Sequence, residues 1–116
     1  MHEVLVGGVT LQNPILNAAG TMGFGSSYAD YIDLNRLGGL VTRTMTAAPR
    51  PGAPNPRLWE TAAGLLNHVG LQNPGYEKFA QVFYRSLEKL HVPVVASITG
   101  TPDEIRQMTG RLCELE

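Results

Sequence analysis

Residues 66–75, with the sequence Leu-Asn-His-Val-Gly-Leu-Gln-Asn-Pro-Gly, form the segment best suited to binding a small flat molecule. The Asn67 side chain can both donate and accept hydrogen bonds, and the absence of a side chain at Gly70 allows another group to approach the backbone closely. A strand end that presents Asn67 to a planar ligand needs this combination. The segment therefore predicts a binding loop.

Other polar or glycine residues follow short apolar stretches, which we expect to be strands. They are Ala18-Ala19-Gly20-Thr21, Arg43-Thr44, and Ser97 with Thr99-Gly100. In parallel α/β folds the carboxyl ends of the strands meet at one edge, where ligands bind. We expect these groups to share that edge.

The first half of the chain must supply the strands that carry these groups. Residues 4–6 and 9–11 predict a β-hairpin, because Gly7-Gly8 suits a two-residue turn. A strand over 15–18 and a helix over 28–37 follow, with Ser26 or Ser27 as the helix N-cap. The glycines at 38 and 39 end that helix, and residues 40–42 predict a buried strand. Four prolines make residues 47–57 a long ordered loop.

The second half continues the alternation of strands and helices. Residues 76–90 predict an amphipathic helix with an apolar face; the residues of that face are Phe79, Val82, Phe83, Leu87 and Leu90. A buried strand over 94–98 and a helix over 102–115 follow, with Thr101 as N-cap and Pro102 in the first turn. This order favours an α/β fold with a parallel sheet.

Composition limits the classes of function. The chain has 116 residues, 43% of them hydrophobic, and a formal charge of −1. It has neither the basic excess of nucleic-acid-binding proteins nor a transmembrane segment or signal peptide, so we expect a cytoplasmic protein with no nucleic-acid or membrane partner. No histidine has metal-ligand spacing, and no metal is expected. The single cysteine, Cys113, is expected to be buried and inert.

Four motifs carry a resemblance to a known family. They are 13–25 (Asn-Pro-Ile-Leu-Asn-Ala-Ala-Gly-Thr-Met-Gly-Phe-Gly), 42–46 (Thr-Arg-Thr-Met-Thr), the stretch 49–57 with Pro-Arg-Pro-Gly and Asn-Pro-Arg, and 66–75. In this order and spacing the chain resembles the N-terminal part of class 1 dihydroorotate dehydrogenases, with 71–75 closest to class 1B. The glycines at 20, 23 and 25 do not fit the dinucleotide-binding fingerprint, G-x-G-x-x-G.

The resemblance implies a (β/α)8 TIM barrel, which takes about 250 residues. Residues 1–116 would supply a leading β-hairpin and about three strand-helix units. We therefore expect a partial FMN-binding TIM-barrel domain, incomplete relative to the family. An isolated piece of this kind is expected to be inactive and to self-associate or be poorly ordered.

The resemblance also implies where FMN binds. Backbone groups of Ala18, Ala19, Gly20 and Thr21 would lie against the flavin, and Arg43, Thr44 and Ser97 would complete its site. Arg43, at a position where the family usually has lysine, would offset charge on the reduced flavin and face a substrate carboxylate. Read from the residues alone, 18–21 is a tight turn, Arg43 pairs with a carboxylate such as Glu60, and Ser97 bonds within a strand.

The same resemblance places the substrate against Asn67, His68, Val69, Gly70 and Leu71, with Asn67 bonding the pyrimidine edge and main-chain groups of 69–71 adding contacts. In a purely structural reading Asn67 caps a turn, Leu71 is core and His68 is structural or exposed at the rim. No catalytic residue is expected in this chain, because the general base of the family would lie beyond Glu116.

The implied activity is FMN-dependent oxidation of dihydroorotate to orotate in pyrimidine (UMP) biosynthesis. The class 1B likeness further implies an iron-sulfur FAD electron-transfer subunit as partner and NAD as acceptor, while the sequence itself leaves both NAD and fumarate open as acceptors. A homo-oligomer is also expected. Two alternatives remain open at this point. One is a related FMN-dependent pyrimidine reductase or dehydrogenase, raised by Arg43, and the other is a noncatalytic partial-barrel module.

Overall fold

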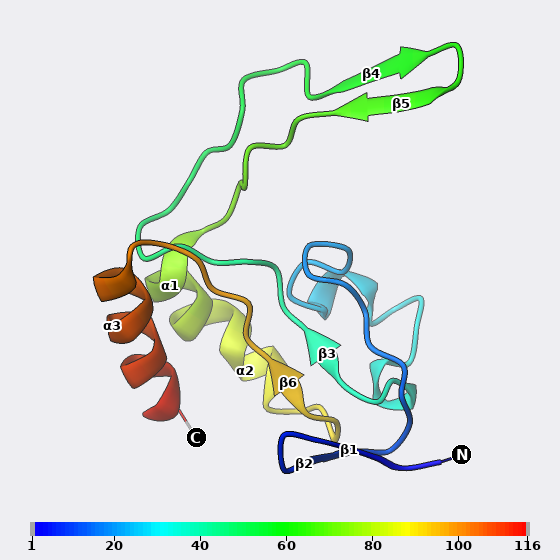
Figure 1. Cartoon of the computed structure of the whole chain (residues 1–116), viewed down its shortest axis with the longest axis vertical. Coiled ribbons are helices and arrows are strands. Elements are labelled where there is room, and N and C mark those ends of the chain that lie inside the picture. Colours follow the sequence, from blue (N-terminus) through cyan, green and yellow to red (C-terminus); the bar gives the residue numbers. More distant parts are fainter. Residues whose placement is uncertain (1, 116) are drawn as a thin grey trace.

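The computed structural model describes residues 2–115 and has two parallel strands at its centre. Strand β3 (Leu40–Val41) pairs with β6 (Val94–Val95) through Leu40 with Val94 and Val41 with Val95. Figure 1 shows the two strands side by side, pointing the same way. Isolated parallel bridges, Leu16 with Gly39 and Met45 with Ile98, extend the pairing. Three chain segments thus run parallel, in the order 16, 39–45, 94–98, and the parallel arrangement is as the sequence predicts. The expectation that the strand over 94–98 is buried is wrong for Val94 and Val95, which are 38% and 48% exposed.

The predicted strand at 15–18 is reduced to the single bridge at Leu16, and the reason is the side chain of Asn17. Asn17 Nδ2 donates to Val41 O, and Val41 N donates to Asn17 Oδ1, both at 2.8 Å. A side chain therefore takes the backbone groups of β3 that a neighbouring strand would bond. The chain stays beside β3 but leaves the strand conformation one residue later.

The predicted helix over 28–37 is wrong. Two 3₁₀ turns, η1 (Ser26–Tyr28) and η2 (Leu34–Arg36), take its place. Gly25, at φ 86°, precedes η1, and neither serine acts as a side-chain cap. Asp33 starts η2 by accepting a hydrogen bond from the Asn35 amide. Short polar side chains that bond the nearby backbone compete with the hydrogen bonds of a continuous helix. In this segment the bond to Asp33 replaces a helical one, and the continuous helix does not form.

The predicted helix over 76–90 is confirmed with a local change. It consists of α1 (Gly75–Lys78), a π-helical segment η3 (Phe79–Phe83) and α2 (Tyr84–Leu87). Phe79 and Leu87 are buried, whereas Val82, expected on the same face, is 53% exposed. The wider π turn shifts the residues that follow it around the helix axis, which a regular 3.6-residue pattern does not anticipate.

Helix α3 (Pro102–Cys113) begins as predicted, because the Thr101 and Glu104 side chains form a capping box with each other's backbone amides. Its inward face contains the buried Met108 and the half-buried Glu104 and Leu112, which are four residues apart. Cys113 lies one residue beyond that stripe and is exposed, so the expectation of a buried thiol is wrong.

Two β-hairpins flank the parallel strands. The first, β1 (Val4–Val6) with β2 (Val9–Leu11), is confirmed, and both of its turn glycines have positive φ. The second, β4 (Leu58–Thr61) with β5 (Gly64–Asn67), is not predicted by the sequence. Figure 1 shows it projecting from the rest of the molecule. Every residue of it is exposed, and its Ala62-Ala63 turn lacks the Asn-Gly or Asp-Gly signal of a tight turn.

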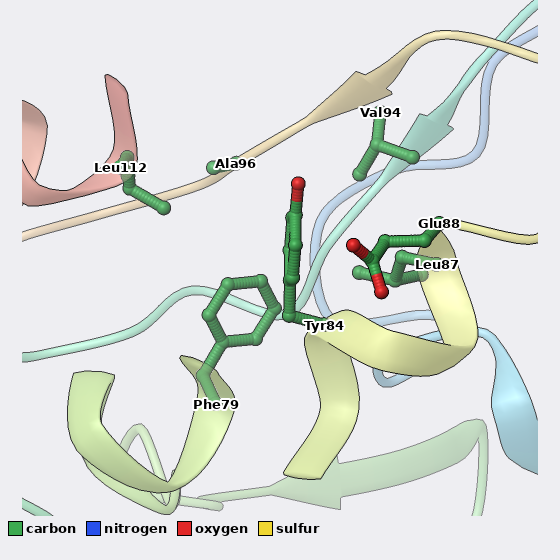
Figure 2. A pocket seen from close by; sticks show the side chains of 7 residues that line it. All are labelled: Phe79, Tyr84, Leu87, Glu88, Val94, Ala96 and Leu112. Atoms are coloured by element: carbon green, nitrogen blue, oxygen red, sulfur yellow. The ribbon is translucent and has the colours of Figure 1, made fainter. Parts of the chain in front are cut away.

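The core lies between the parallel strands and the helices. Its buried members are Phe24, Leu34, Leu40, Met45, Phe79 and Leu87. Beside it, a cavity of about 270 Å³ opens between α2, β6 and α3, where Tyr84 stands between Phe79 and Leu87 (Figure 2). Among residues 2–115, no helix has both the length and the apolar character needed to span a bilayer.

Candidate functional site

The ends of β3 and β6 carry a connected polar cluster of Arg43, Thr44 and Ser97. Thr44 Oγ1 and Ser97 Oγ are 2.8 Å apart, and Met45 N donates to Ser97 O at 2.9 Å. Arg43 N donates to Gly23 O at 2.7 Å, which ties the loop after the first parallel segment to the same place. All three side chains are half-buried. The strand pairing thus brings together residues 54 positions apart in the chain.

Residues 18–21 form a tight turn between Asn17, which bonds Val41, and Gly23, which bonds Arg43. Thr21 donates to Ala18 O through both its amide, at 3.2 Å, and its hydroxyl, at 2.6 Å. Gly20 has φ 83°, and a Cβ added there would meet no atom within 4 Å. The turn is exposed and its side chains are small, so its backbone has open space in front of it.

Arg43 is oriented by a backbone carbonyl rather than by a carboxylate. Its Nε donates to Gln72 O at 2.6 Å. The two ion pairs found among residues 2–115 join Arg106 to Asp103 and Arg111 to Glu77, so the pairing of Arg43 with Glu60 is not observed. A hydrogen bond to a neutral carbonyl orients the guanidinium and leaves its positive charge uncompensated.

Two loops, 47–57 and 68–75, are joined along their length beside this cluster. Arg50 and Asn73 exchange backbone hydrogen bonds of 2.9 and 3.1 Å, and Ala53 N donates to Val69 O at 3.0 Å. His68 N donates to Arg57 O at 2.9 Å. The proline-rich loop predicted to be ordered is therefore ordered by pairing with the segment that carries the predicted substrate contacts.

Arg57 and Gln72 strengthen the joint between the loops, and sequence reasoning missed both. Arg57 donates to Pro51 O at 2.8 Å, to Ala53 O at 2.6 Å and to Gln72 Oε1 at 2.7 Å. Gln72 thus contacts Arg57 through its side chain and Arg43 through its carbonyl. The sequence does not predict this role of Arg57, because the carbonyl groups around its planar guanidinium come together only in the folded chain.

The close backbone approach expected at Gly70 is present, but the neighbour is the other loop. A Cβ at Gly70 would lie 2.4 Å from Ala53 N, and one at Gly52 would lie 2.5 Å from Val69 O. Both glycines have positive φ, at 72° and 79°. The packing of loop against loop explains these glycines without a ligand.

Asn73 is the buried centre of the joint. Its Oδ1 accepts from Thr46 N, Thr46 Oγ1 and Gly75 N at 3.2, 3.1 and 2.9 Å, and its Nδ2 donates to Leu71 O at 2.8 Å. The side chain is only 5% exposed, so water cannot replace these partners freely. Among residues 2–115, Leu71 is the one residue other than glycine with a backbone in the left-handed region, at φ 56°. The hydrogen bond from Asn73 Nδ2 to Leu71 O stabilises this conformation.

Replacing Asn73 by alanine should lower the free energy of unfolding by about 2 kcal/mol, because buried donors lose their acceptor. Urea denaturation followed by circular dichroism measures the change. The matched control is Gln107→Ala, which removes an amide from an exposed position on α3 and should change stability by less than about 0.5 kcal/mol. Equal effects of the two substitutions would contradict the role given to Asn73.

The structure leaves Asn67 and His68 at the edge of this arrangement. Asn67 is the last residue of β5 and pairs with Leu58. Both Asn67 and His68 are exposed, and for His68 this agrees with the structural reading that puts it at the rim. They connect to Arg43 through the backbone of 69–72 and not by a direct hydrogen bond among the described residues. Binding of substrate by residues 67–71 stays a prediction, with the Val69 carbonyl already bonded to Ala53.

Arg50, in the loop 47–57, acts on one nearby carboxyl. The carboxyl of Glu104 has a pKa below its usual value, first because the Thr101 backbone donates to it at 2.7 Å and also because of the nearby positive charge of Arg50. In the described part of the chain, no group of three histidine, cysteine or acidic side chains is placed to hold a metal ion.

Comparison with known proteins identifies relatives over almost the whole chain. The family model for dihydroorotate dehydrogenase matches residues 1–113. A relative from Desulforudis audaxviator, named dihydroorotate dehydrogenase B (NAD(+)), catalytic subunit, is 51% identical over 94% of this chain and 36% of its own length. One of the same name from Pelobacter propionicus is 42% identical over 97% of this chain and 37% of its own. The chain thus spans little more than a third of these relatives.

Solved structures show the same fold. The crystal structure of a DHODH from Eimeria tenella in complex with ferulenol superimposes with a TM-score of 0.68 at 20% identity, covering 97% of this chain and 34% of that one. The ligand-free DHODH from the same organism gives a TM-score of 0.65 at 21% identity. At this level of identity the likeness concerns the path of the backbone.

Proposed function

The chain belongs to the dihydroorotate dehydrogenase family, and on that premise we propose that it supplies part of the FMN and substrate site of an enzyme that oxidises dihydroorotate to orotate in pyrimidine biosynthesis. The family match over residues 1–113 carries the proposal. The fold that goes with it is the first part of a (β/α)8 barrel, supported by parallel segments whose polar carboxyl ends gather at one edge.

The turn at 18–21 fits the flat ring of FMN. Its small side chains, the positive φ of Gly20 and the free space in front of that residue leave room for a planar group against the backbone. Ala18, Ala19, Gly20 and Thr21 would form the bed of the ring, and Thr44 and Ser97 would contribute hydroxyls from the adjacent strand ends. When bound, FMN supplies the acceptor for the hydride that leaves the substrate.

Arg43 balances charge in this arrangement. Its guanidinium is held at the strand end by Gln72 O and lacks a carboxylate partner within residues 2–115, so its charge is available to an anionic ligand. Such a preoriented cation stabilises negative charge more effectively than a mobile one, because no reorganisation is needed during the reaction. It would face the carboxylate of the substrate and the edge of the ring where negative charge increases.

Residues 67–71 form the proposed substrate wall. Asn67 would bond the pyrimidine edge through its amide, and the backbone of Val69, Gly70 and Leu71 would add contacts, with His68 at the rim. The joint with loop 47–57 fixes the path of this backbone before any ligand arrives. Preorganisation of this kind lowers the entropy cost of binding.

The names of the relatives indicate a catalytic subunit of an NAD(+)-linked enzyme. We propose that this protein also has a partner subunit of the iron-sulfur FAD type, which passes electrons to NAD. We further propose that it forms a homo-oligomer and is located in the cytoplasm. We assign the role of general base to none of residues 2–115.

Anaerobic addition of dihydroorotate to the purified FMN-loaded enzyme to which this chain contributes tests the proposal, because the chain alone is expected to be inactive. The yellow absorption band of the flavin should bleach in proportion to the orotate formed. If the band persists with dihydroorotate but the protein uses NADH or NADPH to reduce uracil, the related pyrimidine reductase is the correct assignment. A protein that folds but does not retain FMN would indicate a noncatalytic module.

A further inference from the structure

A second cavity lies next to the strand-end cluster and shares only Arg43 with the residues that the proposed function uses. It has a volume of about 450 Å³ and lies between the loop at 23–27, the segment 72–74 and helix α1. Arg43 forms one wall, but none of the predicted substrate contacts at 67–71 lines it. Its size falls within the range of small-molecule sites in proteins, which is about 300–1,000 Å³.

The lining of this cavity is strongly positive. It contains Arg43, Arg50 and Lys78, and no aspartate or glutamate. These three cations form no ion pair within residues 2–115. Glu104, whose pKa is lowered in part by the charge of Arg50, does not line the cavity, and its carboxylate bonds the Thr101 amide instead. The positive charge in the cavity is therefore not balanced by the protein.

The cations come from three separate segments, two of which are firmly held. Arg43 is fixed by Gln72 O and Gly23 O, and no hydrogen bond within residues 2–115 uses the terminal nitrogens of its guanidinium. The backbone of Arg50 is fixed by its two bonds to Asn73. Lys78 ends helix α1. Three cations that line one cavity without a protein carboxylate among them favour an anionic ligand there.

The rest of the lining suits an organic group attached to that anion. Phe24 and Phe83, whose rings stack with centroids 4.5 Å apart, line the cavity together with Pro74. Ser26 and Ser27 add hydroxyl groups. Apolar and aromatic walls with a few converging polar groups are the usual composition of a ligand site.

We propose that this cavity binds a phosphate monoester of nucleotide size in addition to FMN, at a site that includes neither the turn at 18–21 nor the dihydroorotate contacts of residues 67–71. A monocarboxylate would leave most of the positive charge of three cations uncompensated, whereas a phosphate dianion offsets more of it and offers three acceptor oxygens. The volume exceeds what a bare phosphate fills, and the aromatic wall accommodates the organic part. The proposal does not depend on the redox activity.

Isothermal titration of the purified FMN-loaded protein at constant ionic strength tests this site. The probes are inorganic phosphate, uridine 5′-monophosphate and uridine. The nucleotide should bind, and uridine should bind at least about tenfold more weakly, because it lacks the charge-assisted hydrogen bonds. In the variants Arg50→Gln and Lys78→Gln, nucleotide affinity should fall about tenfold for each cation removed. Both side chains are exposed, so the fold should persist.

Arg85→Gln is the matched control, since it removes an exposed cation of α2 that does not line this cavity, and it should leave affinity unchanged. Tighter binding of the nucleotide than of inorganic phosphate assigns the ester as the ligand, and equal affinity assigns free phosphate to the same cations. Failure of both probes to bind, or an affinity that the two variants leave unchanged, overturns the proposal. Flavin reduction by dihydroorotate, measured on the same samples, reports separately on the proposed enzyme.

Discussion

Replacing Arg43 by alanine should slow the reduction of bound flavin by dihydroorotate about 100-fold, since removal of one preoriented charge-stabilising group from an active site costs about that much. Arg43 is held by Gln72 O and has no carboxylate partner within residues 2–115, so its charge is available to the proposed ligand. Anaerobic stopped-flow measurement of flavin absorbance gives the rate. Stability should change little, because the side chain is only half-buried and makes one hydrogen bond through its side chain.

Arg43→Lys is the informative companion variant. Lysine keeps the charge that the family resemblance leads us to expect at this position, but a compact ammonium cannot reproduce the bond from Nε to Gln72 O in the same geometry. We expect it to recover most of the rate lost in Arg43→Ala. Flavin reduction at the wild-type rate in the alanine variant would remove Arg43 from the mechanism.

Replacing Gly70 by alanine should lower the free energy of unfolding by about 3 kcal/mol. Roughly 1 kcal/mol comes from placing a side chain at φ 72°, and about 2 kcal/mol from a Cβ 2.4 Å from Ala53 N, which forces the two loops apart. Chemical denaturation measures the loss. Separation of the loops would also break the hydrogen bond between Arg57 and Gln72, which helps to fix the backbone of 67–71. The affinity of that segment for its proposed ligand should therefore fall as well.

Gly8→Ala separates the two contributions. Gly8 has φ 87°, and a Cβ there would meet nothing within 4 Å, so this variant reports the backbone strain without the collision. Its cost should be about 1 kcal/mol. If Gly8→Ala and Gly70→Ala lower the free energy of unfolding equally, the close contact between the two loops does not explain the glycine at position 70.

Elements with strong local signals were predictable from the sequence. The hairpin turn at Gly7-Gly8 and the N-cap at Thr101 follow from residue types within a few positions. The parallel pairing of 40–41 with 94–95 follows from the alternation of strands and helices along the chain. The structure of residues 28–37 was not predictable, because their apolar spacing is typical of a helix, whereas Gly25 and Asp33 start two separate 3₁₀ turns. Local hydrogen bonds from short side chains outweighed the periodicity there.

The candidate site was predictable in part. The positions of Arg43, Thr44 and Ser97 at neighbouring strand ends follow from the alternation of strands and helices, and the bond between Thr44 and Ser97 joins them. The joint between loops 47–57 and 68–75 was not predictable, because it depends on backbone pairing across an exposed hairpin with no periodic signal. Arg57 and Asn73 acquire their roles only through that pairing.

A crystal structure of the FMN-loaded protein with orotate measures the central claim most directly, since it shows whether the strand ends and the 67–71 backbone form one site. The flavin ring should lie against the turn at 18–21 with Arg43 and Ser97 beside it, and orotate should contact Asn67. A flavin bound away from that turn, or an orotate out of reach of Asn67, would contradict the claim.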